Sequence, residues 1–270
     1  MQKLFFSTVL LLLFCAACKR DSKSGDANAV SLTASPDLLG GDWIAMDFCS
    51  RANQYGSVLA AMNNANLPYA YAMTFDSTKR DSVICFNGFE SWTLPVKYNA
   101  DTLELVGARQ GKSIFLVYDS QHGKDITMFD ATTGGVHLDR FVKSRADAKN
   151  GYAAFAIALN HNLMGGTFTP LGKGASGDVQ FTPGGLIQGL KDYDHYRVCT
   201  GGDCFVAGQA IDVVTFSNSR VENSDKFMGY RFSAKNDTLT IFNLLNTNPD
   251  EKGKYKVNGV AYKFLRKKSQ

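Results

Sequence analysis

The sequence predicts a mainly β protein made of two tandem antiparallel β-barrels, joined by an α-helix and with one further helix inserted in the first half. Three observations support this fold class. A short motif recurs in both halves, short apolar runs have the period of strands, and most of the 25 glycines lie between those runs, where tight turns need them. The formal net charge of +4 is small and spread along the chain, so it gives no electrostatic argument for nucleic-acid binding, which needs a clustered basic face, and we expect no nucleic-acid partner.

The clearest sign of duplication is a six-residue motif. Leu-Leu-Gly-Gly-Asp-Trp at residues 38–43 returns as Leu-Met-Gly-Gly-Thr-Phe at residues 163–168, shifted by 125 residues. Two further echoes follow in the same order along each half: residues 101–105 return as 237–241, and residues 138–142 return as 261–265. We therefore expect one β-rich unit that is used twice.

The repeat and the local composition divide the chain into five parts. In order, they are a leader at 1–17, a flexible tether at 18–36, a first β domain at 37–145, a linker helix at 146–163 and a second β domain at 164–270. The tether is polar and without periodicity, so it buries too little apolar surface to offset the entropy of ordering it. At 44% hydrophobic residues, the chain can give each β domain a core.

Two segments have the period of an amphipathic helix. In the first half, four apolar residues fall at i, i+3, i+4 and i+7: Tyr55, Val58, Leu59 and Met62. They predict a helix over about 51–66, with Ser50 as its cap. A second stripe predicts the linker helix over roughly 146–162, through Tyr152, Phe155, Ala156, Leu159 and Leu163.

The other apolar runs are short and are separated by turn residues, which is typical of strands in a sandwich or barrel. In the first half, we expect an opening strand over 43–48 and further strands over 70–75, 82–86, 91–98, 102–106, 113–118, 125–129 and 136–142. In the second half, we expect strands over 166–170, 177–181, 185–190, 194–198, 204–208, 210–217, 226–234, 237–243, 254–257 and 260–266.

The N-terminus combines a basic residue, an apolar run over 4–14 that is too short to span a bilayer, and Cys-Ala-Ala-Cys at 15–18. Small residues before a cysteine resemble the lipobox of bacterial lipoproteins, although Cys15 stands where Leu is usual. The resemblance implies cleavage after residue 17, lipidation of Cys18, and anchorage in the cell outer membrane on its periplasmic face or on the cell surface. An ordinary cleaved secretory leader is the alternative.

Four cysteines follow Cys18, an even number that suits export to an oxidising compartment. Cys199 and Cys204 flank a four-residue Thr-Gly-Gly-Asp loop in a predicted hairpin, so their thiols can meet across its neck. We favour this hairpin disulfide. Cys49 and Cys85 are then either a second bridge within the first half or buried thiols.

The repeated motif carries a second resemblance. Gly41 and Trp43, with Asp42 between them, resemble the G-x-W that opens the first strand of lipocalins. Gly166 and Phe168 hold the same places in the second half, with Phe in place of Trp. The resemblance implies tandem lipocalin-like (calycin-type) barrels, each with a basic side chain of its last strand packed over the aromatic ring. The candidates are Arg140 or Arg145 in the first half and Lys263 or Arg266 in the second. The helix after the first strand departs from the family pattern.

No catalytic constellation stands out in the sequence. Two groups of titratable residues could converge at a barrel mouth: His137 with Asp139, and His195 with Asp192 and Asp194. Neither has a nucleophile beside it in the sequence. A metal held by His195 and two thiolates lacks a fourth ligand, so we predict no metal and no cofactor.

The expected function follows from the leader, the repeat and the missing catalytic set. We expect a lipid-anchored, non-enzymatic envelope protein that binds a small apolar or amphipathic ligand in a barrel or docks envelope partners. Scattered strand aromatics either fill the barrel or line such a cup. The alternative is an envelope enzyme or enzyme inhibitor whose site lies on loops at a barrel mouth.

Overall fold

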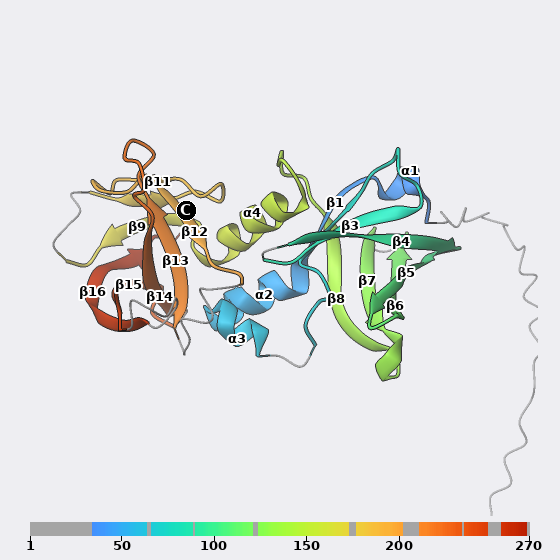
Figure 1. Ribbon diagram of the computed structural model, residues 1–270. Coiled ribbons are helices and arrows are strands. Elements are labelled where there is room, and N and C mark those ends of the chain that lie inside the picture. The colour runs from blue at the N-terminus through green and yellow to red at the C-terminus, as the bar shows by residue number, and fades with distance from the viewer. Residues whose placement is uncertain are drawn as a thin grey trace, which may run out of the picture. The chain divides into compact units, whose positions relative to one another are not determined.

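A computed structural model describes residues 34–63, 66–88, 90–120, 124–172, 177–201, 211–233, 235–247 and 255–268, and Leu32–Gln270 form one compact unit. The expected leader, the tether up to residue 33, Cys18 and Cys204 lie outside the described residues. Within them, the structure confirms the predicted fold class, because two eight-stranded antiparallel sheets account for most of the regular structure (Figure 1). No described helix is both long and apolar enough to cross a membrane.

The first half is a closed barrel in which each strand pairs with the next and the last returns to the first. Its strands are β1 (Gly41–Ala45), β2 (Ala72–Phe75), β3 (Ser82–Phe86), β4 (Ser91–Asn99), β5 (Thr102–Arg109), β6 (Lys112–Asp119), β7 (Asp125–Asp130) and β8 (Val136–Lys143). A 3-10 turn, η1 (Ala131–Thr133), joins the last two. Every neighbouring pair of strands is antiparallel, as the short loops that join β2 through β8 require.

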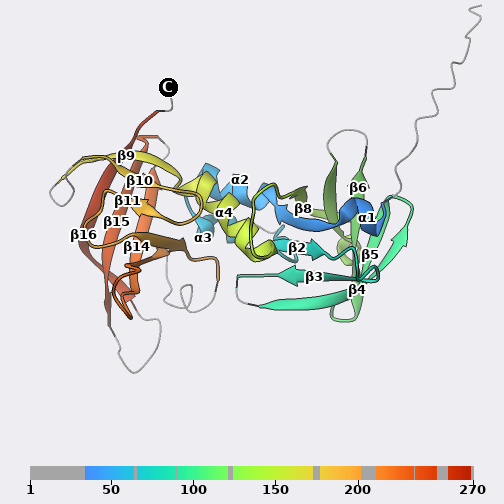
Figure 2. The same cartoon turned by 90° about the horizontal axis from the view of Figure 1, so that it is seen from above.

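The second half repeats this order. Its strands are β9 (Gly166–Pro170), β10 (Val179–Phe181), β11 (Ile187–Gln188), β12 (His195–Val198), β13 (Asp212–Ser217), β14 (Lys226–Ser233), β15 (Thr238–Asn246) and β16 (Tyr255–Arg266) (Figure 2). The edge strands meet, because the Ile187 amide donates to the Asp194 carbonyl and the Tyr196 amide to the Gly185 carbonyl, both at 2.7 Å. The sheet is therefore barrel-like, with the strand order of the first half.

Four α-helices accompany the sheets: α1 (Pro36–Leu39), α2 (Met46–Tyr55), α3 (Val58–Met62) and α4 (Gly151–Leu163). The prediction of one helix over 51–66 was wrong in its bounds. The strand β1 ends at Ala45, and the helical segment begins at Met46 and breaks at Gly56, whose φ of 62° is left-handed. A side chain at Gly56 would lie 2.5 Å from the Phe232 carbonyl oxygen, so the close approach of β14 requires glycine there.

The linker helix is confirmed as α4, which begins at Gly151, later than expected. Asn150 caps it, with its side-chain oxygen accepting from the Ala153 amide at 2.9 Å. Aromatic rings join α4 to α2 and the first barrel: Tyr71 stacks on Phe155 with centroids 5.0 Å apart, and Phe48 lies 4.7 Å from Tyr71. This cluster fixes both helices against the barrel.

The last strand also differs from its prediction. The expected strands over 254–257 and 260–266 are one strand, β16, which continues through Gly259 at a φ of 83°. Its pairing with β15 shifts register near Phe242, which absorbs the irregularity. The expected strand over 204–208 lies outside the described residues.

Candidate functional site

In the first barrel, the repeated G-x-W-like motif has a structural role: it connects β1 to α1 and to β8. Trp43 is 1% exposed, and its indole nitrogen donates to the Leu39 carbonyl at 2.7 Å. The side chain over its ring is Lys143, whose Nζ lies 6.0 Å from the ring centroid and donates to the Leu38 carbonyl at 3.4 Å. The candidates Arg140 and Arg145 were wrong, because the register of β8 pairs Lys143 with Trp43 directly.

The second half repeats the arrangement with different residues. Arg266 lies over Phe168 at 5.2 Å, as one of the two candidates predicted, and pairs with it across β9 and β16. Its Nη2 donates to the Leu163 carbonyl at 2.6 Å, and Leu163 stands 125 residues after Leu38. In each half, the motif residues therefore lie where the first and last strands pair, and they connect these strands to the helix before them.

Both barrel interiors are filled by side chains. In β5, β6 and β7, the inward residues have no exposed surface: Leu103, Leu105, Ile114, Leu116, Ile126 and Met128. In the second sheet, Phe168 meets Phe181 edge to face at 5.6 Å and Phe264 at 6.2 Å. Because these side chains are buried and in contact with one another, they form packed cores rather than the lining of a cup.

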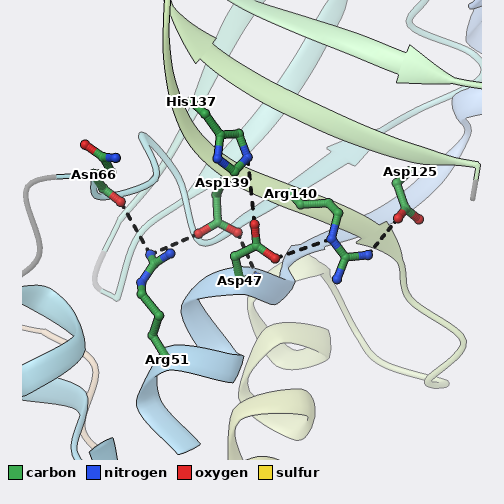
Figure 3. Close-up of polar contacts among 7 residues, drawn as sticks. All are labelled: Asp47, Arg51, Asn66, Asp125, His137, Asp139 and Arg140. Atoms are coloured by element: carbon green, nitrogen blue, oxygen red, sulfur yellow. Dashed lines mark hydrogen bonds and ion pairs between the residues drawn. The ribbon is translucent and has the colours of Figure 1, made fainter. Parts of the chain in front are cut away.

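A polar cluster lies where the N-terminus of α2 meets β8 (Figure 3). The side chain of Asp139 is fully buried and accepts from the Asp47 amide at 3.0 Å and from Arg51 Nη2 at 3.2 Å. Asp47 in turn accepts from Arg140 Nε at 3.3 Å, and Arg140 donates to Asp125 at 2.7 Å. Alternating charges link the inserted helix to strands β7 and β8.

Asp139 substitutes for a missing helix cap. The N-cap of α2 is Ala45, whose side chain cannot accept a hydrogen bond, so the carboxylate of β8 satisfies the free Asp47 amide. Burial raises the pKa of Asp139 to about 7, although Arg51 and the Asp47 amide oppose the shift. The cluster holds the helix and keeps a protonatable carboxyl in the protein interior.

The predicted pairing of His137 with Asp139 does not form. His137 is directed to Asp47 instead, with Nε2 3.8 Å from the carboxylate, while Asp139 is occupied by Arg51 (Figure 3). The thiol of Cys49 is close enough to interact electrostatically with Asp139, but it is fully buried, and burial raises its pKa far above the ordinary value. A thiol in that state is a poor nucleophile.

The second predicted group also has a structural role. His195 Nδ1 lies 2.7 Å from Asp194, and the same carboxylate accepts from the Ser219 amide at 2.8 Å and from its hydroxyl. These hydrogen bonds, led by those of Ser219, lower the pKa of Asp194. Asp192 is exposed and contributes its carbonyl to Asn218 at 3.2 Å. These hydrogen bonds stabilise the turn between β13 and β14.

The cysteines follow one of the two alternatives for the first half. Cys49 and Cys85 are free and buried. Desolvation raises the pKa of the Cys85 thiol to about 12. Cys199 lies just after β12 and the predicted bridge to Cys204 stays a prediction, because Cys204 lies outside the described residues.

A groove lies at one end of the first barrel, between β1, β8 and α4. Its volume is about 880 Å³. Apolar side chains from these elements and from α1 line it: Leu38, Ile44, Val142, Ala154, Ile157 and Ala158. A groove of this size and lining is typical of sites for small organic ligands.

Charged side chains surround the groove. Lys124, Lys143 and Arg145 are exposed along it, and Asp125 is its one acidic residue. Asp125 is already bound to Arg140 at 2.7 Å, so its charge is compensated within the protein. The groove therefore combines an apolar floor with a positive rim.

Sequence reasoning missed this groove because its lining is drawn from five separated segments. One signal was available: α4 is apolar on more than one face, so its core stripe through Phe155 and Leu159 leaves Ala154, Ile157 and Ala158 on a second apolar face. A helix that is apolar on several faces needs cover on each of them.

Among the described residues, no group of three or more His, Cys, Asp or Glu side chains is placed to hold a metal ion. Comparison of the chain with protein-family models, with curated proteins and with solved structures finds no match.

Proposed function

We propose that this chain is a lipid-anchored, non-enzymatic protein of the bacterial cell envelope with tandem lipocalin-like domains. It binds a small amphipathic molecule in the groove between the first barrel and α4. The observation that carries the proposal is the groove of about 880 Å³ with an apolar floor, beside barrel interiors that are already filled. The proposed binding site is thus a groove at the end of the barrel rather than a cup inside it.

The binding test fills the groove. Ala158→Trp places an indole on the floor contributed by α4, and Thr93→Trp places one on the exposed face of β4 as the matched control. The mature protein, purified from its own envelope, is examined by native mass spectrometry for a retained small molecule. We expect that mass in the wild-type protein and in Thr93→Trp, and its loss in Ala158→Trp.

Retention of the same mass by Ala158→Trp would show that the groove is not the site. If the wild-type protein retains no mass and binds no added alkyl amphiphile, ligand binding is wrong. The packed barrels then favour the other version of the function, a docking module for envelope partners.

The anchor is tested separately at Cys18. We expect the wild-type chain to incorporate labelled palmitate and to sediment with the outer membrane. The variant Cys18→Ser is expected to do neither. Membrane association of Cys18→Ser would overturn the lipid anchor and favour an ordinary secretory leader.

A second candidate function is an envelope enzyme or enzyme inhibitor with its site at a barrel mouth. The polar cluster favours it, because Asp139 has a raised pKa and His137 lies 3.8 Å from Asp47. The replacements His137→Gln and Asp47→Asn test it against any activity found in the purified protein. Full activity in both variants would dispose of this function.

A further inference from the structure

We infer that the occupant of the groove is a single-chain amphiphile with one anionic group, held at Lys124 and Arg145 while its chain lies on the apolar floor. The inference rests on the proposed function and gives its ligand a chemical class. It depends on which charges along the groove are already engaged and which are not.

Lys143 is partly committed within the protein. Its ammonium lies over the Trp43 ring and donates to the Leu38 carbonyl. The one acidic residue of the lining, Asp125, is held by Arg140 at 2.7 Å. The charge of Asp125 is thus compensated within the protein, and the Lys143 ammonium already has contacts there.

Lys124 and Arg145 are in a different state. Both are exposed and line the groove, and in the described part of the chain neither side chain has a hydrogen bond or an ion pair. Two uncommitted cations beside an apolar surface favour an anionic group that neutralises them, since an Arg or Lys with a carboxylate or phosphate forms a charge-assisted hydrogen bond.

The floor fixes the other part of the ligand. Ala154, Ile157 and Ala158 lie at i, i+3 and i+4 on α4, so they form one continuous stripe along the helix. Ile44 of β1 and Val142 of β8 line the groove with them. This narrow apolar stripe fits one alkyl chain, and the volume is that of a site for one drug-sized molecule.

The charge pattern also decides between classes of amphiphile. A cationic head would meet Lys124 and Arg145 with the same sign of charge. A neutral head would gain no charge-assisted hydrogen bond from either cation. Only an anionic head gains one from both, so specificity resides in these two side chains and affinity in the chain contacts.

The test uses the mature chain, residues 18–270, with Cys18→Ser so that no detergent is needed. Titration calorimetry compares decanoate, decyltrimethylammonium and decyl maltoside below their micellar concentrations. We expect decanoate to bind at least tenfold more tightly than the other two. Lengthening the acid from eight to ten to twelve carbons is expected to strengthen binding by up to about fourfold per buried methylene.

Charge reversal assigns the effect to the two cations. The double variant Lys124→Glu with Arg145→Glu is expected to weaken decanoate binding at least tenfold and to strengthen decyltrimethylammonium binding. The control, Lys112→Glu with Arg197→Glu, makes the same change in net charge at exposed positions outside the groove lining. We expect it to leave decanoate binding within twofold of wild type.

The two proposals fail in different ways. Equal affinity for all three head groups, or equal loss in the control and the groove variant, overturns the anionic assignment and leaves ligand binding in place. If none of the three probes binds the wild-type chain, both the assignment and the proposed ligand binding are overturned.

Discussion

The carboxylate of Asp212 on β13 accepts a hydrogen bond from the backbone amide of Leu59 at 2.9 Å, across 153 residues of sequence. Leu59 lies in the first turn of α3, whose N-cap is Ser57. The second barrel thus supplies a carboxylate to a helix of the first half, as Asp139 does for α2 from within the first half. Both inserted helices begin on a buried carboxylate from a strand.

Removing this contact is expected to destabilise the whole chain. Asp212 is 7% exposed, so Asp212→Ala leaves the Leu59 amide unsatisfied in the interior, and we expect a loss of about 1–3 kcal/mol in the free energy of unfolding. Asp212→Asn keeps an acceptor and is expected to lose less. Urea denaturation measures both, and a change below about 0.5 kcal/mol in the Ala variant would contradict the prediction.

A second prediction concerns pH. The pKa of Asp139 is about 7 in the folded protein, above its ordinary value of 3.8, because burial disfavours the charged form. Between these values the folded state binds more protons than the unfolded state. The stabilisation from this group is therefore complete below about pH 4 and is lost as the pH rises through 7.

The variant Asp139→Asn removes this titration. Urea denaturation at pH 5 and pH 8 should show the wild-type protein losing more stability than the variant over that interval, by on the order of 1–3 kcal/mol. Asp37→Asn is the control, since Asp37 is exposed in its ion pair with Arg80. An unchanged pH dependence in Asp139→Asn would show that another group is responsible.

The two basic side chains over the motif aromatics are expected to contribute unequally to the stability of the protein. Arg266 lies between the rings of Phe168, at 5.2 Å, and Phe232, at 4.4 Å, and is half buried. Lys143 is exposed and meets one ring at 6.0 Å. We expect Arg266→Ala to cost about 2 kcal/mol of stability and Lys143→Ala about 0.5 kcal/mol.

Calorimetric melting of the two variants gives the comparison. Arg266→Lys serves as the control for charge alone, because it keeps the positive charge and loses the planar group that lies against two rings. An equal loss of stability in the two alanine variants would show that the burial of Arg266 between two rings does not add to its contribution.

The thiols of the first half give a further prediction. Cys49 and Cys85 are free and fully buried, and burial raises the pKa of both thiols, so almost no reactive thiolate forms at neutral pH. We expect neither to react with a maleimide in the native protein and both to react in 6 M guanidinium. Peptide mapping that finds a bridge between them would contradict this.

The repetition of the fold could be predicted because short segments of matching sequence recur in the two halves. Residues 38–43 and 163–168 share spacing and residue type, and the same interactions follow from both, including the donor to Leu38 in one half and to Leu163 in the other. The strands could be predicted from runs of period two, because successive side chains of a strand point to opposite faces of the sheet.

What the sequence could not give depends on contacts between distant residues. The break at Gly56 follows from the approach of the Phe232 carbonyl. The choice of Lys143 over Arg140 and Arg145 depends on a register that neither strand specifies alone. The groove is formed by β1, β8 and α4 together, so it could not be predicted from any one of these segments.

The close approach of Gly56 to Phe232 and the hydrogen bond from Leu59 to Asp212 join the first half to the second, which limits where the chain can be cut into stable fragments. A fragment ending at residue 145 would keep α3 but lose the acceptor for its Leu59 amide, and it would also lose Phe155, on which Tyr71 stacks. The two halves are similar in strand order, but the first half depends on contacts with residues that follow it. Natural or engineered excision of the N-terminal copy would therefore yield a polypeptide with an exposed aromatic seam, prone to self-association, whereas the intact pair shields it.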